Sequence, residues 1–221
     1  VMKKTTLAAN LSCNRQGEVK SCLTKDVLGF YHDDYPGGGR WKIDGTMENL
    51  ICTLKNDRVK YSESVLQDSM KRLGDILKED LPAVLSEMGY STLRVCVVPR
   101  SKSELHLKED EKLFRQTVQN VVKQTFRLED GTHDIIRHTN TRTTHSNKSG
   151  NGGDGDMPYV GITNDTCDIS DAVIGKVVLL IDDLYTKSVN IDEDCIQALL
   201  DKGAKEVVFY SVGRTIRRGL I

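Results

Sequence analysis

The chain has 221 residues, 29% of them charged, and a formal net charge of -1. This length suits one generous domain or a core with a smaller appendage, while the near-zero net charge gives no general electrostatic reason to expect nucleic acid or a membrane as partner. No apolar run approaches the length of a membrane span, and the start, VMKKTTLAAN, lacks the apolar core of a secretory signal, so we expect a soluble cytoplasmic protein.

The first part of the chain carries the weakest structural signals. Residues 1–30 show few periodic apolar positions. The segment HDDYPGGGRW, residues 32–41, has the proline and glycines of an exposed loop. We therefore interpret its histidine and two aspartates as solvated loop residues rather than as a metal site.

Helical spacing first appears over Ile43–Leu54, with Asp44 or Thr46 available as the N-cap. A second helical pattern follows, and we expect Pro82 to interrupt it and to start another helix that ends at Gly89. The sequence therefore predicts that residues 1–91 form a helix-rich, hood-like appendage.

A short apolar strand is predicted over Leu93–Val98. Arg100, Ser101 and Lys102 follow at its carboxyl end. Two cations and a hydroxyl suit a polyanion such as pyrophosphate, which needs positive charge and short donors. Basic residues after a proline also occur in plain surface turns, so both interpretations stay open at this point.

The next segment combines a helix with a long polar stretch. Apolar spacing predicts a helix over Asp110–Thr125, and Ile135 and the range Tyr159–Ile162 are candidate strand starts. Between them, residues 138–156 are polar and rich in glycine, and loops of this length are functional lids or disordered. Residues 146–156 have almost nothing to bury, so we expect them to be mobile without ligand.

The most informative stretch begins with five apolar residues, Val177–Ile181. The run is too short for a buried helix and rich in β-branched residues, which indicates a central strand covered on both faces. It ends on two acids, Asp182 and Asp183, and an amphipathic helix is predicted over Ile191–Lys202 with Gly203 as its C-cap. Ligands in open α/β sheets bind beyond the carboxyl ends of strands, so the polar loop after the acids is the expected site.

A final strand is predicted over Val207–Val212, followed by Gly213 and Arg214. Because apolar runs alternate with helical patterns, we expect a parallel sheet that contains this strand and Leu93–Val98, with Val177–Ile181 at or near its centre. Arg214 would reach a carboxylate or phosphate of an acceptor, or belong to a solvated basic tail.

The residues IDDLYTKSVN, which end at Asn190, resemble the signature of type I phosphoribosyltransferases. That signature has a strand of aliphatics, two acids, an aliphatic, a variable residue and then Thr-Thr-Gly-x-Thr. The chain follows it through Thr186 and then departs, with Lys187 for the second threonine, Ser188 for the glycine and Asn190 for the last threonine. Ser188 loses the freedom of glycine at positive φ, whereas Lys187 adds a cation.

The resemblance implies roles for these residues. In the family the two acids hold the ribose hydroxyls of phosphoribosyl pyrophosphate, and the loop holds its 5'-phosphate. The implied site therefore has Asp182 and Asp183 as catalytic and ribose-binding residues, which also hold Mg²⁺ through the ligand or water. The implied ribose-phosphate loop continues through Tyr185, Thr186, Lys187, Ser188, Val189 and Asn190, and the implied pyrophosphate loop is Arg100, Ser101 and Lys102.

The same resemblance places a mobile catalytic loop within residues 138–156. Arg142 is the catalytic residue that we carry over there. The register is open, however, because Arg137, Thr141 and His145 also fit the loose pattern of the competence-type, ComF-like branch. The region before the core also resembles that branch, which has a tyrosine there, followed by two aliphatics, an aliphatic and a lysine. The matching residues here are Tyr35, Leu50, Ile51, Leu54 and Lys55.

The resemblance thus implies an α/β fold with a type I phosphoribosyltransferase-like core over residues 92–221. The expected function is transfer of a phosphoribosyl group to an unidentified base or amine with release of pyrophosphate, in nucleotide metabolism, by a homodimer. The alternative is a catalytically inactive module that binds phosphoribosyl pyrophosphate or a nucleotide and acts in regulation or protein interaction. The altered Lys187, Ser188 and Asn190 favour that alternative.

Overall fold

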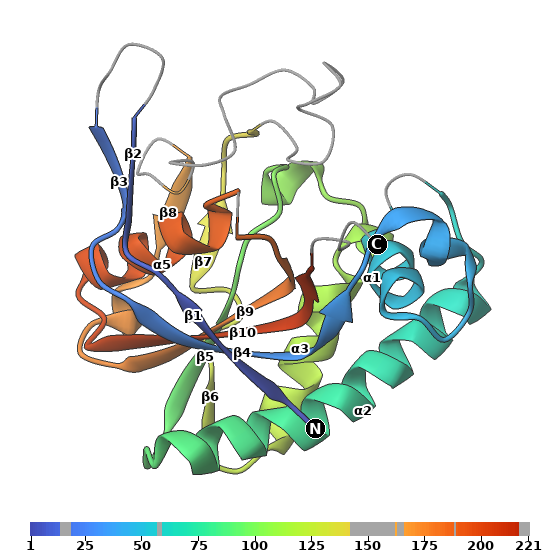
Figure 1. Ribbon diagram of the computed structural model, residues 1–221, viewed down its shortest axis with the longest axis horizontal. Helices are drawn as coiled ribbons and strands as arrows, with labels where there is room; N and C mark the ends of the chain where they lie inside the picture. The colour runs from blue at the N-terminus through green and yellow to red at the C-terminus, as the bar shows by residue number, and fades with distance from the viewer. Residues whose placement is uncertain (14–18, 57–58, 142–161, 163–165, 188, 217–221) are drawn as a thin grey trace.

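A six-stranded sheet forms the centre of the computed structural model, which describes residues 1–13, 19–56, 59–141, 162, 166–187 and 189–216 (Figure 1). In spatial order the strands are β1 (Lys3–Leu7), β4 (Val27–Tyr35), β10 (Glu206–Thr215), β9 (Val177–Tyr185), β5 (Leu93–Val97) and β6 (Leu128–Asp130). All neighbours pair in parallel except β1 and β4. The α/β class and the three expected parallel strands, with β9 between the other two, are therefore confirmed.

Two small antiparallel sheets lie outside the main one. They are formed by β2 (Asn10–Cys13) with β3 (Val19–Leu23), and by β7 (Ile135–Arg137) with β8 (Cys167–Ile169). The strand expected to start at Ile135 is thus confirmed as β7, and its partner is β8. Residues 159–161 of the other expected strand lie outside the described residues.

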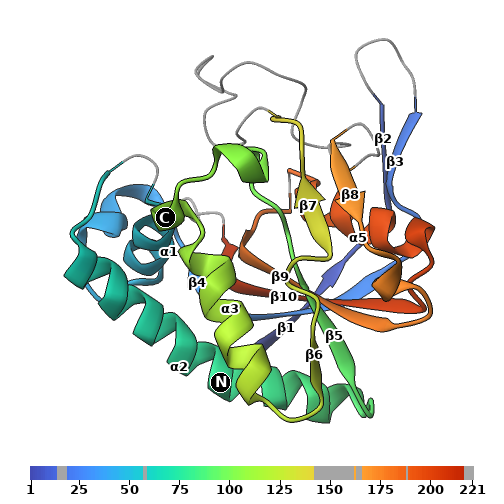
Figure 2. The same ribbon diagram turned by 180° about the vertical axis from the view of Figure 1, so that it is seen from behind.

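Helices cover both faces of the sheet (Figures 1 and 2). Among the described residues, the α-helices are α1 (Met47–Lys55), α2 (Glu63–Met88), α3 (Leu113–Gln124) and α5 (Ile191–Lys202), and the 3-10 helices are η1 (Gly38–Lys42), η2 (Glu104–His106), η3 (Glu109–Glu111) and η4 (Asp171–Val173). On β9, Leu179 and Ile181 pack with α1, α2 and α3, whereas Val178 and Leu180 pack with α5. Both faces of the central strand are buried, as its continuous apolar run predicts.

Two helix predictions have different outcomes. Thr46 caps α1, because its Oγ1 accepts a hydrogen bond from the Asn49 N–H at 3.1 Å. The expected break at Pro82 is wrong, since α2 runs through it from Glu63 to Met88. Pro82 and Lys78, whose carbonyl loses its helical donor, lie on the exposed side of α2, where water can replace the missing bond.

Residues 1–91 differ from the expected helix-rich appendage. They supply β1 and β4 to the main sheet and α1 and α2 to one of its faces. The beginning of the expected exposed loop, residues 32–35, belongs to β4, where Asp34 pairs with Arg214 of β10. Ladder pairing with β10 overrides the low strand propensity of the aspartates, and Lys3 Nζ contacts Asp33 and Asp34 at 2.8 and 2.9 Å.

The chain order of the strands creates a topological switch point between β5 and β9. From β5 the chain passes through α3 to β6 on one side, and later enters β9 on the other side. Among the described residues, the β5–β9 ladder ends at the pair Val97 and Ile181, while β9 continues along β10 to Tyr185. Ligands of open α/β sheets bind at such a point.

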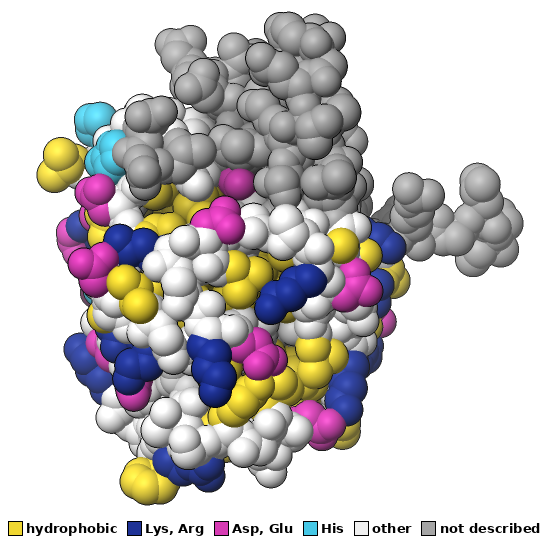
Figure 3. Space-filling model, turned by 90° about the vertical axis from the view of Figure 1, so that its left-hand side faces the viewer, with side chains coloured by type: hydrophobic (Ala, Val, Ile, Leu, Met, Phe, Trp, Pro, Cys, Tyr) yellow, Lys and Arg dark blue, Asp and Glu magenta, His cyan; other side chains and the backbone are white. Residues whose placement is uncertain are grey.

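The surface carries both charges. On the face shown in Figure 3, Lys and Arg side chains are interspersed with Asp and Glu and with hydrophobic groups. Within the described ranges, no helix has the length together with the apolar character needed to cross a membrane.

Candidate functional site

Asp182 and Asp183 lie at the switch point and contact different layers. Side chains of a regular strand alternate between the two faces of the sheet. Ile181 and Leu184 are three residues apart but both pack on the side of α1, so this alternation shifts by one residue between them. Asp183 Oδ1 lies 3.1 Å from Lys55 Nζ of α1, whereas Asp182 shares a side-chain hydrogen bond with Asp192 of α5. The Asp182 carboxylate also accepts the Asp183 N–H at 2.8 Å, which fixes the turn of the chain here.

Lys55 is a site residue that sequence reasoning did not assign. Its side chain is 20% exposed and that of Asp183 is 18% exposed. Burial opposes the charge on Lys55, but Asp183 and Asp182 outweigh it and raise the lysine pKa. Lys55 is the last residue of α1, so only the folded sheet brings it to the acids, and its local sequence carries no signal of this contact.

The carboxyl groups of Asp182 and Asp192 form a buried pair. Burial, followed by the charge of Asp183, raises the pKa of Asp182 to about 7. Asp192 is only 3% exposed, and this burial, together with the charge of Asp182, raises its pKa well above the ordinary value. Two carboxyl groups that share a hydrogen bond hold a proton between them, so this end of the site is less negative than its four oxygens suggest.

The start of α5 is occupied by further acids of the chain itself. Glu193, which is 3% exposed, accepts a hydrogen bond from the Tyr185 hydroxyl at 2.9 Å. Burial raises the pKa of Glu193, and the nearby charge of Lys187 partly opposes this. The sequence leaves open whether these acids are a solvated cap or face the site, and the structure shows them buried.

The expected ribose-phosphate loop connects β9 to α5. Tyr185 is buried in the core and directs its hydroxyl to α5, and Thr186 Oγ1 lies 2.7 Å from Thr215 Oγ1 of β10. The Val189 N–H donates to the Thr186 carbonyl at 3.0 Å, closing a turn that leaves Lys187 exposed. Asn190 has a φ of 60°, which asparagine tolerates better than most residues; Ser188 lies outside the described residues.

The expected pyrophosphate loop follows β5 and is held by protein contacts. Arg100 Nη1 donates to the carbonyls of Lys55 and Glu111 at 3.0 and 3.1 Å. Lys102 Nζ contacts Glu111 Oε1 at 2.8 Å. Burial would raise the pKa of Glu111, but Lys102 and a backbone N–H outweigh it and lower the pKa. The loop therefore places Arg100 next to Lys55 and ties Lys102 to a buried acid.

The segment after β7 runs beside the same loop. Arg137 Nε donates to the Arg100 carbonyl at 2.7 Å, and the Thr141 N–H donates to the Ser101 carbonyl at 2.8 Å. Arg137 and Thr141, two of the possible equivalents of the family's catalytic-loop pattern, therefore lie beside the loop after β5. Arg142, His145 and residues 146–156 lie outside the described residues.

In the part of the chain that the structure describes, no group of three or more His, Cys, Asp or Glu residues is placed to hold a metal ion. Asp182 and Asp183 nevertheless offer hard carboxylate oxygens. Mg²⁺ commonly binds through one or two carboxylates together with water and ligand phosphates, and this donor set fits that mode.

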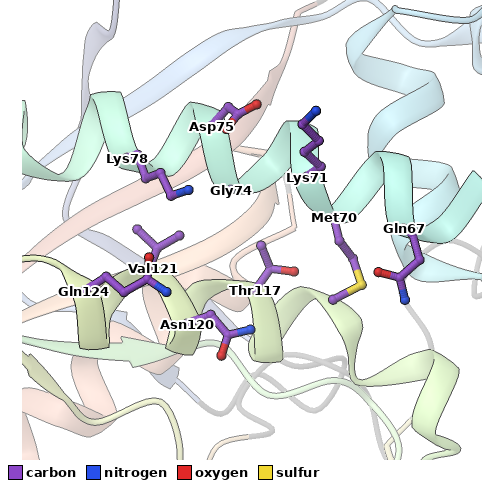
Figure 4. A pocket seen from close by; sticks show the side chains of 10 residues that line it. All are labelled: Gln67, Met70, Lys71, Gly74, Asp75, Lys78, Thr117, Asn120, Val121 and Gln124. Carbon is purple, nitrogen blue, oxygen red and sulfur yellow. The ribbon is translucent and has the colours of Figure 1, made fainter.

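A separate groove of about 240 Å³ lies between α2 and α3 (Figure 4). Its walls mix apolar and polar side chains, and it shares no residue with the acids at the switch point. Figure 4 shows Met70 and Lys78 directed toward α3, whereas Asp75 points away from it. The groove has no convergent set of charges, so the candidate site is the switch point.

No protein-family model matches the chain, and no curated protein matches it at a significant level.

Proposed function

We propose that the protein binds a phosphorylated ribose, such as phosphoribosyl pyrophosphate, at the carboxyl ends of β5 and β9. The observation that carries the proposal is a pair of adjacent carboxylates, Asp182 and Asp183, at the switch point. Lys55 Nζ lies 3.1 Å from Asp183, and Arg100 donates to the Lys55 carbonyl. Adjacent carboxylates at a strand end are costly unless they meet donors, a metal or solvent. Ribose hydroxyls supply donors, and phosphates match the cations.

The proposed reaction is transfer of the phosphoribosyl group to a nitrogen base or amine with release of pyrophosphate. Displacement at the anomeric carbon develops positive charge on the sugar ring, so the site must hold the hydroxyls, receive the departing anion and exclude water. Asp182 and Asp183 hold the hydroxyls, and Arg100 receives the anion. Mg²⁺, bound by the phosphates and by these aspartates directly or through water, would neutralise the leaving group.

A second candidate is a module that binds the same ligand without turnover. The observation that favours it is the start of α5, where the Glu193 carboxylate is buried and accepts the Tyr185 hydroxyl. A helix N-terminus is otherwise suited to a phosphate. A regulatory protein needs an occupied pocket but no efficient chemistry, so weaker phosphate binding is compatible with such a role.

Titration calorimetry with phosphoribosyl pyrophosphate and ribose 5-phosphate, each with Mg²⁺, tests both candidates. Binding of phosphoribosyl pyrophosphate followed by pyrophosphate release with one of a panel of nucleobases and amines supports the enzyme. Binding without release across the panel supports the module. If neither ligand binds at millimolar concentration, both functions are wrong.

A further inference from the structure

We propose that Lys55, at the end of α1, receives the diphosphate end of the ligand together with Arg100, in the role that the sequence assigns to Lys102. This inference rests on the proposed function. It names a residue from the first 91 positions as the determinant that distinguishes a ribose diphosphate ligand from a ribose monophosphate.

Lys102 and Lys55 differ in what they contact. Lys102 is 47% exposed and pairs with Glu111, whose side chain is 3% exposed. Moving Lys102 to a ligand would leave a buried carboxylate without this partner, which is costly. Lys55 instead contacts Asp183, one of the two acids to which the proposed function assigns the sugar. An ammonium group has three donors, so contact with a carboxylate does not prevent contact with a phosphate.

Lys55 and Arg100 also form a pair of cations. Arg100 Nη1 donates to the Lys55 carbonyl at 3.0 Å, and the charge of Arg100 partly opposes the rise in the Lys55 pKa that the two aspartates cause. Like charges held near each other disfavour one another unless an anion lies between them. Asp183 supplies one negative charge there, and a diphosphate would supply more.

Lys187 is an exposed cation in a different part of the site. Lys187 lies in the turn between β9 and α5, and its charge acts on Glu193. Among the described residues, Lys187 therefore lies on the α5 side, whereas Lys55 and Arg100 lie on the side of α1 and the loop after β5. A ribose with phosphates at both ends matches this division, with the 5'-phosphate near Lys187 and the diphosphate near Lys55.

The test compares two ligands with three variants of the full chain. Calorimetry with Mg²⁺ measures phosphoribosyl pyrophosphate and ribose 5-phosphate binding to the unmodified protein, Lys55→Met, Lys55→Arg and the control Lys102→Met. We expect Lys55→Met to weaken phosphoribosyl pyrophosphate binding ten- to a hundredfold, on the order of one charge-assisted bond. We expect its ribose 5-phosphate affinity to stay within about threefold.

Lys55→Arg keeps the charge, so it should restore most of the affinity for phosphoribosyl pyrophosphate and, by binding at all, report a folded site. Lys102→Met should lower the free energy of unfolding, because Glu111 loses its partner. Its folded form should keep both affinities within about threefold, because Lys102 does not contact the ligand. The inference is overturned if Lys55→Met weakens both ligands equally, if it changes neither, or if Lys102→Met has the larger effect. Absence of binding to the unmodified protein would instead reject the proposed function itself.

Discussion

Asp182→Asn should stabilise the protein, and by more at pH 8 than at pH 5. The folded chain raises the pKa of Asp182 from 3.8 to about 7, chiefly through burial. A raised carboxyl pKa means that the proton stabilises the folded state fully below pH 3.8 and that this contribution is lost as pH rises through about 7. Three pKa units correspond to roughly 4 kcal/mol.

Asparagine keeps the shape of the side chain and removes this ionisation. Because Asp182 shares its proton with Asp192 and is not fully buried, we expect about half of the full value, a gain of about 2 kcal/mol in the free energy of unfolding at pH 8. At pH 5 the gain should be below about 1 kcal/mol, since the folded chain still holds the proton.

Urea unfolding followed by circular dichroism at both pH values measures the gain, provided that the transition is two-state. Asp168→Asn, at an exposed position of β8, is the matched control and should change stability by less than about 0.5 kcal/mol at either pH. A gain for Asp182→Asn that is absent at pH 8, or no larger there than at pH 5, would refute the assignment of a buried, proton-sharing carboxyl.

Three further predictions concern binding. Lys187→Ala should weaken phosphoribosyl pyrophosphate and ribose 5-phosphate about equally, by roughly ten- to a hundredfold in calorimetry, because a charge-assisted bond to phosphate contributes about 1.5 to 3 kcal/mol; unequal losses would contradict its place at the 5'-phosphate. Asp183→Asn should reduce pyrophosphate release more than it reduces binding of inorganic phosphate, and a parallel fall in both would argue against contact with the sugar. Glu193→Gln should tighten ribose 5-phosphate binding about threefold, since it removes a carboxylate that occupies the start of α5; weaker binding would show that Glu193 helps the ligand.

The sequence predicts the central strands because their burial leaves a simple pattern. Val177–Ile181 is apolar throughout since both faces are covered, and the middle of β10 follows the same rule, as does Leu93–Val97 apart from Arg94. The first strands leave no such pattern. In β4, HDDY carries polar residues whose partners, Lys3 and Asp80, come from distant parts of the chain.

For the candidate site, too, the sequence predicts one part and leaves out another. Asp182 and Asp183 follow a strong strand signal, and their position at the switch point is a consequence of topology. The partners of these acids are not local, because Lys55 comes from α1 and Asp192 from the far side of the sheet. Helical spacing alone also cannot distinguish a buried acid at the start of α5 from a solvated one.

The contacts of Asp183 bear on how the chain divides into functional parts. A boundary near residue 91 follows from the change in sequence pattern, yet the parallel neighbour of β10 on one side is β4 and the cation beside Asp183 belongs to α1. Removing residues 1–91 would expose an edge of a buried strand and leave a half-buried carboxylate without its partner, and both changes are costly. The first 91 residues are therefore part of the sheet and of the candidate site, and variants there should be tested for binding as well as for stability.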